Sequence, residues 1–128
     1  MKAPTALIAL SYFAHLGLCF PGTATRYRPP YTPNKCYHDK LAEIPGDGLF
    51  GAVGPHLWNK GAACGRKFKI TCYKPVANGQ GLCTGTTITI KIIEGRLGNR
   101  SPDFSLSTTA ADLLYTGEGT FRAQFVEV

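Results

Sequence analysis

The stretch WNKGAACGRKFKITC, residues 58–72, carries the main clue to the fold. A loop rich in glycine and alanine runs into Cys64, and every second residue then becomes apolar. The apolar positions are Phe68, Ile70 and Cys72, and the polar ones between them are Lys67, Lys69 and Thr71. This alternation predicts a strand from Arg66 to Cys72 with one face in the core. The cysteine at its start could serve a disulfide, a redox or metal site, or a binding face.

Short strands and glycine-rich loops are expected through the rest of the chain. Residues 86–93, TTITIKII, give the strongest strand signal because they are rich in β-branched residues. Shorter strands are expected at 23–27 and 120–128, loops at 28–48, and a turn at 78–81. Residues 105–115 predict a short helix with Ser107 as its N-cap. This pattern favours a β-barrel over a sandwich of long hairpins.

The first residues have the composition of a secretory signal peptide. Lys2 precedes an apolar run from Ala6 to Leu18, which is too short to span a bilayer. Small residues suited to cleavage occur at Gly17-x-Cys19 and Gly22-x-Ala24, so cleavage is expected between positions 19 and 24. We therefore expect residues 1–19 to be the signal peptide and residues 20–128 to form one secreted domain. A buried N-terminal helix is the competing interpretation.

Cysteine usage agrees with a secreted protein. Cys19 lies beside the expected signal peptide, and an even number of cysteines remains: Cys36, Cys64, Cys72 and Cys83. In an oxidising compartment this indicates two disulfides. Zinc is the competing reading, but no close Cys-x-x-Cys pair occurs, so neither a metal nor another cofactor is expected.

The chain is moderately basic, with a formal net charge of +6. On a secreted protein such a charge favours anionic partners such as acidic polysaccharides or membrane headgroups, and nucleic acid is not expected there. Ordinary solubility is the plainer explanation of the same charge.

Four segments, in order, carry a resemblance to a known family. They are GTATRYRPPYTPNKCY (22–37), LWNKGAACGRKFKITC (57–72), CTGTTITIKII (83–93) and FSLSTTAADLL (104–114). Together they resemble the plant natriuretic peptides, also described as family-45 endoglucanase-like or expansin-like single domains. The resemblance implies an all-β, six-stranded double-psi β-barrel with a short helix, long loops and disulfides. It also implies secretion to the extracellular space or cell wall, and signalling in water and salt balance.

The same resemblance implies the pairs Cys36–Cys64 and Cys72–Cys83, and an activity-linked segment from about Pro29 to Lys67. One departure from the family is large. After its long strand the family has an aspartate and then a further pair of cysteines, whereas this chain has Glu94 and Arg96 at or near those positions. The third disulfide is therefore absent, and we expect a looser loop from Gly95 to Pro102.

Catalysis is not expected. A glycosidase needs two carboxyl groups on either side of the bond, and Arg28 and Pro29 stand where family-45 endoglucanases have their first catalytic aspartate. Glu94 could stand for the second. Most isolated carboxylates such as Asp47 and Asp103 cap turns.

A binding surface is the better expectation. Tyr27 and Tyr31 flank a Pro-Pro step that should hold them apart, and their rings could stack on sugars or anchor a protein partner. Trp58 is either part of this surface or part of the core. Further cations should lie on the outer side of the 66–72 strand, as a docking patch or as an ordinary solvated face: Arg66, Lys67, Lys69 and Lys74. Asn99 begins a glycosylation sequon, weakened by Pro102.

Two functions follow from these residues and the resemblance. The first is a secreted, monomeric, non-catalytic regulator of water and salt balance, in which the 29–67 face contacts a membrane receptor. The alternative is a cell-wall protein that binds polysaccharide through Tyr27, Tyr31 and the cations, with Glu94 as a polar contact.

Overall fold

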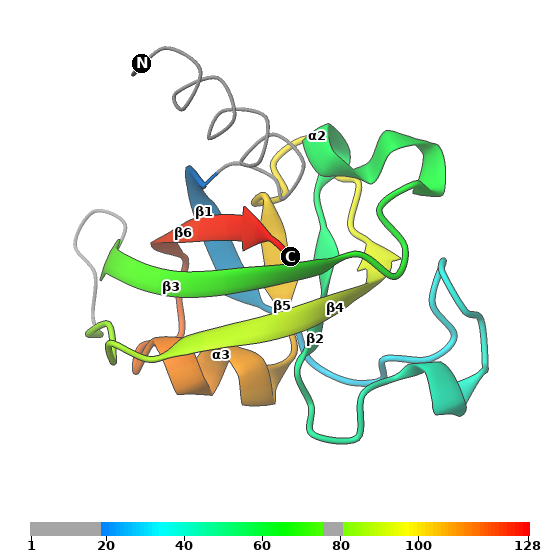
Figure 1. Cartoon of the computed structure of the whole chain (residues 1–128), viewed down its shortest axis with the longest axis horizontal. Coiled ribbons are helices and arrows are strands. Elements are labelled where there is room, and N and C mark those ends of the chain that lie inside the picture. The colour runs from blue at the N-terminus through cyan, green and yellow to red at the C-terminus, as the bar shows by residue number, and fades with distance from the viewer. Residues whose placement is uncertain (1–18, 76–80) are drawn as a thin grey trace, which may run out of the picture.

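The computed structural model describes residues 19–75 and 81–128, which form a closed barrel. Its strands are β1 (Phe20–Arg26), β2 (Phe50–Val53), β3 (Lys67–Pro75), β4 (Thr87–Gly95), β5 (Phe104–Leu106) and β6 (Phe121–Glu127). The helices are α2 (Pro55–Trp58) and α3 (Thr108–Leu114), with two 3-10 turns, η1 (Leu41–Glu43) and η2 (Asn59–Gly61). The long segment between β1 and β2 is mostly loop, as predicted (Figure 1).

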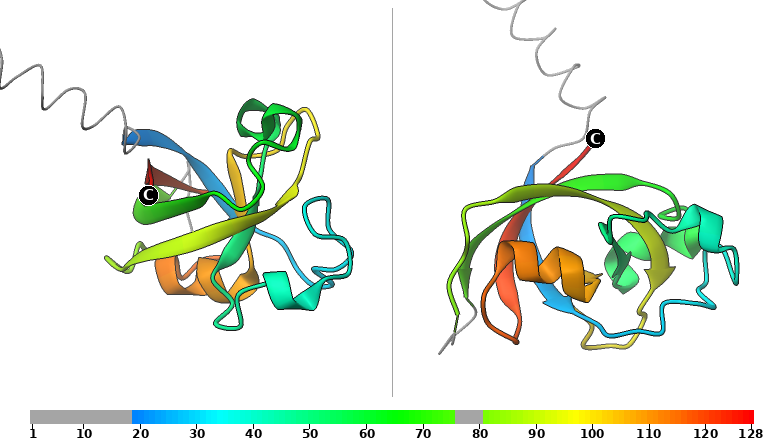
Figure 2. Two further views of the ribbon diagram at one scale, coloured as in Figure 1. Left: turned by 45° about the vertical axis from the view of Figure 1, so that its right-hand side comes forward. Right: turned by 90° about the horizontal axis from the view of Figure 1, so that it is seen from below.

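The strands close in the order β1-β5-β2-β4-β3-β6. The pairs β1/β5 and β2/β4 are parallel, and the other neighbours are antiparallel. Parallel neighbours must be joined by long crossings, and these carry the loops and short helices that cluster beside the barrel (Figure 2). Full closure leaves no open sheet edge, so a barrel this small needs no partner strand.

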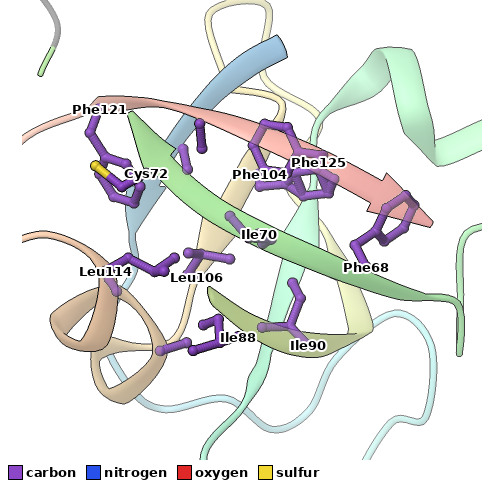
Figure 3. Close-up of a cluster of buried hydrophobic side chains, with 14 of the residues drawn as sticks. Phe68, Ile70, Cys72, Ile88, Ile90, Phe104, Leu106, Leu114, Phe121 and Phe125 are labelled. Carbon is purple, nitrogen blue, oxygen red and sulfur yellow. The ribbon is translucent and has the colours of Figure 1, made fainter. Parts of the chain in front are cut away.

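The alternating apolar residues of the 66–72 stretch fill the barrel, as predicted. Phe68, Ile70 and Cys72 of β3 are buried, while Lys67 and Lys69 are exposed. The inward-facing residues of β4 and β6 meet them from the sides: Ile88, Ile90, Ile92, Phe121, Ala123 and Phe125 (Figure 3). Phe104 of β5 packs on Phe125, with ring centroids 4.1 Å apart.

The helix at 105–115 is confirmed with a shorter range. The hydroxyl of Ser107 accepts a hydrogen bond from the amide of Ala110 at 3.0 Å, which makes it the predicted N-cap of α3. Residues 104–106, however, form β5 and not helix. This strand and β2 were not predicted, because both are short and buried along their whole length, which leaves no alternation to detect.

The four remaining cysteines form the two implied bridges, Cys36–Cys64 and Cys72–Cys83. Cys64 is therefore a disulfide residue and not a metal or redox site. Cys19 is an exposed free thiol. The first strand begins at Phe20, three residues before its predicted start, because residues 20–24 pair with β6. The signal peptide and most of the turn at 78–81 lie outside the described residues.

Candidate binding site

Three aromatic rings pack edge to face where the chain leaves β1. The rings of Tyr27 and Tyr31 have centroids 5.0 Å apart, and those of Tyr31 and Phe50 are 4.8 Å apart. The expectation that the Pro-Pro step holds the two tyrosines apart is therefore wrong. The Tyr31 hydroxyl donates to the carbonyl of Tyr27 at 3.0 Å and accepts from the amide of Thr108 at 3.1 Å, and these bonds fold the segment back. Tyr31 thus links the 27–31 segment to the first turn of α3.

Glu94 lies at the carboxyl end of β4, where a loop takes the place of a neighbouring strand. Its Oε1 accepts hydrogen bonds from the amides of Lys35 at 2.9 Å and Gly95 at 3.1 Å. The ammonium of Lys35 is 3.9 Å from the same oxygen. The amide of Cys36 also bonds to the carbonyl of Ile93 at 3.2 Å, so the first disulfide anchors this loop against β4. Both amides donate to Oε1, and no hydrogen bond to Oε2 is found within residues 19–75 and 81–128.

Trp58 covers the residue after Glu94. It ends α2, a single turn that begins with Pro55, a residue whose fixed φ suits the first helical position. The indole is half-buried and packs against the core. It also lies on the backbone of Gly95, where a Cβ would fall 2.7 Å from Cε3 of the indole. Trp58 therefore belongs both to the edge of the core and to the surroundings of Glu94.

Tyr27 connects the aromatic rings with Glu94. Burial and the negative charge of Glu94 raise the pKa of the Tyr27 hydroxyl above its usual range, while Arg96 acts in the opposite direction. The guanidinium of Arg96 lies 5.3 Å from the centre of the Tyr27 ring. The Tyr27 hydroxyl is buried and has no hydrogen-bond partner among the described residues. One aromatic ring, one carboxylate and one guanidinium therefore converge here.

A cleft of about 320 Å³ opens on the other side of Tyr31. Its lining combines apolar side chains with hydroxyl groups and backbone: Tyr31, Thr32, Leu41, Ile44, Pro45, Gly46, Gly48, Phe50, Ser107 and Thr109. The hydroxyl of Ser107 holds one wall by donating to the carbonyl of Gly48 at 2.5 Å. The cleft adjoins the aromatic rings and offers no charged group, so it suits a neutral ligand.

The cations predicted for the site do not join this group. Arg66 pairs with Glu127 near the end of β6, with Nε 2.7 Å from Oε2 and a second bond through Nη2. Lys67 is exposed on the outer face of β3, opposite Lys91. Of the six predicted binding residues, the structure thus brings together Tyr27, Tyr31, Trp58 and Glu94, and places Arg66 and Lys67 elsewhere.

The other carboxylates support local structure. Asp47 Oδ1 accepts from the amide of Leu49 at 3.0 Å, and Asp103 Oδ2 accepts from the amide of Thr23 at 3.0 Å. No group of three or more potential metal ligands occurs in residues 19–75 and 81–128. Chemically, the site can stack an aromatic ring on a ligand, accept a hydrogen bond from a ligand hydroxyl and hold a polar ligand in place.

Sequence reasoning missed three members of the site: Phe50, Arg96 and Lys35. Phe50 starts a short buried strand, and Lys35 contributes through its backbone amide, so neither carries a pattern of its own. Arg96 follows Glu94 by two residues, and that spacing was the available signal. Asn99 is exposed in the turn after β4, and its glycosylation stays a prediction.

Comparison with known proteins places the chain in a family. No family model matches the chain. It is 30% identical over 108 residues to "EG45-like domain containing protein 2" of Arabidopsis thaliana, covering 84% of this chain and 79% of that protein. A second Arabidopsis relative, "Putative EG45-like domain containing protein 1", is 31% identical over 70% of this chain and 65% of its own length. The "EG45-like domain containing protein" of Citrus jambhiri is 36% identical over 57% of this chain and 53% of its own.

Solved structures of the Clavibacter michiganensis expansin share the fold. The apo form superposes with a TM-score of 0.64 and 21% identity, over 87% of this chain and 50% of the expansin. A mutant form in complex with cellohexaose gives a TM-score of 0.66 at the same identity and the same coverage. This chain spans half the length of these expansins. The likeness confirms the predicted double-psi β-barrel, and the sequence relatives confirm the predicted family. The chain belongs to the EG45-like domain proteins, which are expansin-like and similar to plant natriuretic peptides.

Proposed function

We propose that this protein binds a neutral, β-linked cell-wall polysaccharide without hydrolysing it. The observation that carries the proposal is the geometry at the carboxyl end of β4, where the Trp58 indole lies on Gly95 beside Glu94 and the Arg96 guanidinium lies over the Tyr27 ring. Aromatic rings stack on the apolar faces of sugars, and a carboxylate oxygen accepts hydrogen bonds from sugar hydroxyls. Oε2 of Glu94 and the guanidinium of Arg96 would supply an acceptor and a donor beside the rings.

The fold neighbours support this ligand class. An expansin of the same fold has been solved in complex with cellohexaose, a linear β-linked glucan. The uncharged cleft beside Tyr31 would lengthen the site along a chain of sugars, because it adjoins the same aromatic rings.

Binding without hydrolysis is supported by the carboxylates of the described residues, among which Glu94 is the one placed beside Trp58. Hydrolysis requires a second carboxyl group across the scissile bond, and Asp47 and Asp103 are engaged with backbone amides elsewhere. A reducing-sugar assay on soluble β-glucan tests this point. Activity that disappears in Glu94→Gln would contradict it.

We place the protein outside the cell, in the wall or the extracellular space. Two disulfides suit an oxidising compartment, and residues 1–19 have the composition of a signal peptide. Within the described part of the chain, no helix has the length and apolar character of a membrane span. Mass spectrometry of the protein recovered from culture medium would test both cleavage and disulfide pairing.

Calorimetric titration with cellohexaose and co-sedimentation with insoluble cellulose test the binding itself. Wild-type protein should bind, and Glu94→Gln should bind more weakly. Asp39→Asn is a matched control, because it removes one exposed carboxylate from the same loop region.

A second candidate is the extracellular regulator of water and salt balance. The observation in its favour is the 29–67 segment, which is loop-rich, closed by Cys36–Cys64, and exposes Leu41 at 69%. A membrane receptor could bind such a face. Swelling of wall-free cells discriminates the two functions, because a wall binder should have no effect there. A response at low protein concentration would favour the regulator.

A further inference from the structure

A strip of cations runs along the outer surface of β4, β3 and β6. These three strands are neighbours in the barrel, and their inward residues fill the core, so the alternate residues point to solvent (Figures 1 and 3). Lys91, Gln124 and Val126 also alternate outward but are half-buried. The remaining polar residues of this outer surface, here called the cationic face, are Lys67, Lys69, Thr71, Lys74, Thr87, Thr89 and Arg122. All are exposed except Thr71, which is half-buried. The face was only partly predicted, since Arg122 joins it and Arg66 does not.

Like charges lie directly opposite one another at both ends of β3. Lys67 is paired in register with Lys91 of β4, and Lys74 with Arg122 of β6. Directly opposed like charges destabilise a sheet. The same net charge placed at positions that do not face each other would give the same solubility without this loss of stability. Lys69 lies between the two pairs, opposite Thr89 and Val126.

Nearby carboxylates do not neutralise the face. Glu127 is engaged by Arg66, and Glu43 by the ammonium of Lys91 at 3.1 Å. Asp47 lies at one edge, lining a cleft of about 330 Å³ together with Lys67 and Lys91. Within the described residues, no ion pair is formed by Lys67, Lys69, Lys74 or Arg122.

We propose that the cationic face binds a linear polysaccharide of uronic acids, in which each sugar carries a carboxylate and hydroxyl groups. The ammonium and guanidinium groups match the carboxylates. The threonines match the hydroxyls. Thr71 and Thr87 are hydrogen-bonded to each other at 2.6 Å, and the hydroxyl that accepts this bond keeps its own hydrogen to donate to a ligand. A ladder of strands presents such groups in rows, as a repeating polymer requires.

The same face is poorly suited to other anionic partners. Insertion into a membrane interface needs an apolar side, and a protein interface needs a buried aromatic centre. In the described residues of these three strands, Tyr73 is the one large apolar side chain that is exposed, at 43%, and Lys74 lies 6.0 Å from its ring. A hydrated carboxylated polymer fits a flat surface of cations and hydroxyls better than either.

This site is separate from the one proposed for neutral glucan. Its residues come from the outer faces of three strands, whereas Tyr27, Trp58 and Glu94 surround the carboxyl end of β4. The protein would then bind two chemically different polymers at two places. Either proposal can fail without the other.

Affinity electrophoresis of the oxidised full-length protein through polygalacturonate tests the inference, at about 0.02 M and about 0.2 M salt. The test variant is Lys69→Gln with Arg122→Gln. The control is Arg28→Gln with Arg100→Gln, which removes the same charge from exposed positions off the face. We expect the test variant to lose affinity about tenfold at the lower salt, and the control to lose much less.

Four results would overturn the proposal. Wild-type protein could fail to be retarded at the lower salt, or the control could lose as much affinity as the test variant, which would reduce the effect to net charge. Alternatively, fully methyl-esterified polymer could retard the protein equally. Vesicles with anionic headgroups serve as the competing ligand, and stronger binding to them than to polygalacturonate would reject the polysaccharide. Cellohexaose binding should be unchanged in both variants.

Discussion

The indole of Trp58 lies on the backbone of Gly95, so closely that a Cβ at position 95 would fall 2.7 Å from Cε3 and 2.9 Å from Cδ2 of the ring. The contact fixes the aromatic ring beside Glu94, the residue of β4 that precedes Gly95. The side chain that sequence alone could assign either to the core or to the surface thus connects the two.

Gly95→Ala should displace the indole. We expect an overpacking cost of about 1–3 kcal/mol in the free energy of unfolding, together with weaker binding of cellohexaose. Trp58 is the sole tryptophan of the chain, so its fluorescence reports the displacement directly. Gly119→Ala is the control, because nothing lies within 4 Å of a Cβ there and the residue lies outside the proposed site. An unchanged emission spectrum and unchanged affinity in Gly95→Ala would count against the contact.

The buried guanidinium of Arg26 should contribute more to the free energy of unfolding than the exposed one of Arg28. Its side chain is 6% exposed and binds Asp112 and the carbonyls of Tyr115 and Gly117, which ties β1 to the end of α3. Arg26→Ala leaves the two carbonyls without their donor, whereas the Asp112 carboxylate is 68% exposed and stays hydrated, so we expect a loss of about 1–3 kcal/mol. Arg28→Ala removes an exposed pair with Glu118 and should cost less than about 1 kcal/mol. Urea denaturation measures both, and equal losses would refute the distinction.

The two disulfides should differ in their effect on binding. Chain entropy predicts a loss of about 3–4 kcal/mol for the 28-residue separation of Cys36–Cys64 and about 3 kcal/mol for the 11-residue separation of Cys72–Cys83. Only the first anchors the loop whose Lys35 amide binds Glu94. Paired serine variants, studied below their melting temperatures, should therefore lose glucan affinity in the first case and retain it in the second. Equal affinities would show that the loop does not organise the site.

Acid should weaken the link between Arg66 and Glu127. The hydrogen bond from Arg66 lowers the pKa of Glu127, so the pair contributes stability above the unfolded pKa of about 4.3 and loses it as the pH falls through the lower folded pKa. Because both side chains are about a third exposed, the contribution should be below about 1 kcal/mol. Glu127→Gln should show a flatter stability profile from about pH 4 to pH 2 than wild type. Parallel profiles would show that the pair is not coupled to folding.

Much of the barrel could be predicted because its long strands alternate. In β3, β4 and β6 one face enters the core, so the period of two is visible in the sequence. The buried strands β2 and β5 have no polar face, and their place in the barrel depends on neighbours far along the chain. The pairing of the cysteines came from family resemblance, since spacing alone allows other connections.

The site was predictable in its residue types and not in its geometry. Aromatic residues and Glu94 could be recognised as candidates, but the fold-back that brings Tyr31 onto Tyr27 depends on a hydrogen bond to α3, about 77 residues away. Arg66 was assigned to the site as part of a cationic patch on the outer side of the 66–72 strand, whereas its partner is at the end of β6. Contacts between residues so far apart in the sequence leave no local sequence pattern.

The most direct test of the account is a fluorescence titration of the oxidised protein with cellohexaose, in which Trp58 is the reporter. We predict a saturable change in wild-type protein, and an affinity lower by about tenfold in Glu94→Gln, which loses the charged acceptor while keeping its shape. A wild-type protein with both disulfides formed that shows no saturable change at millimolar cellohexaose, or a Glu94→Gln variant that binds equally well, would contradict the proposed binding site.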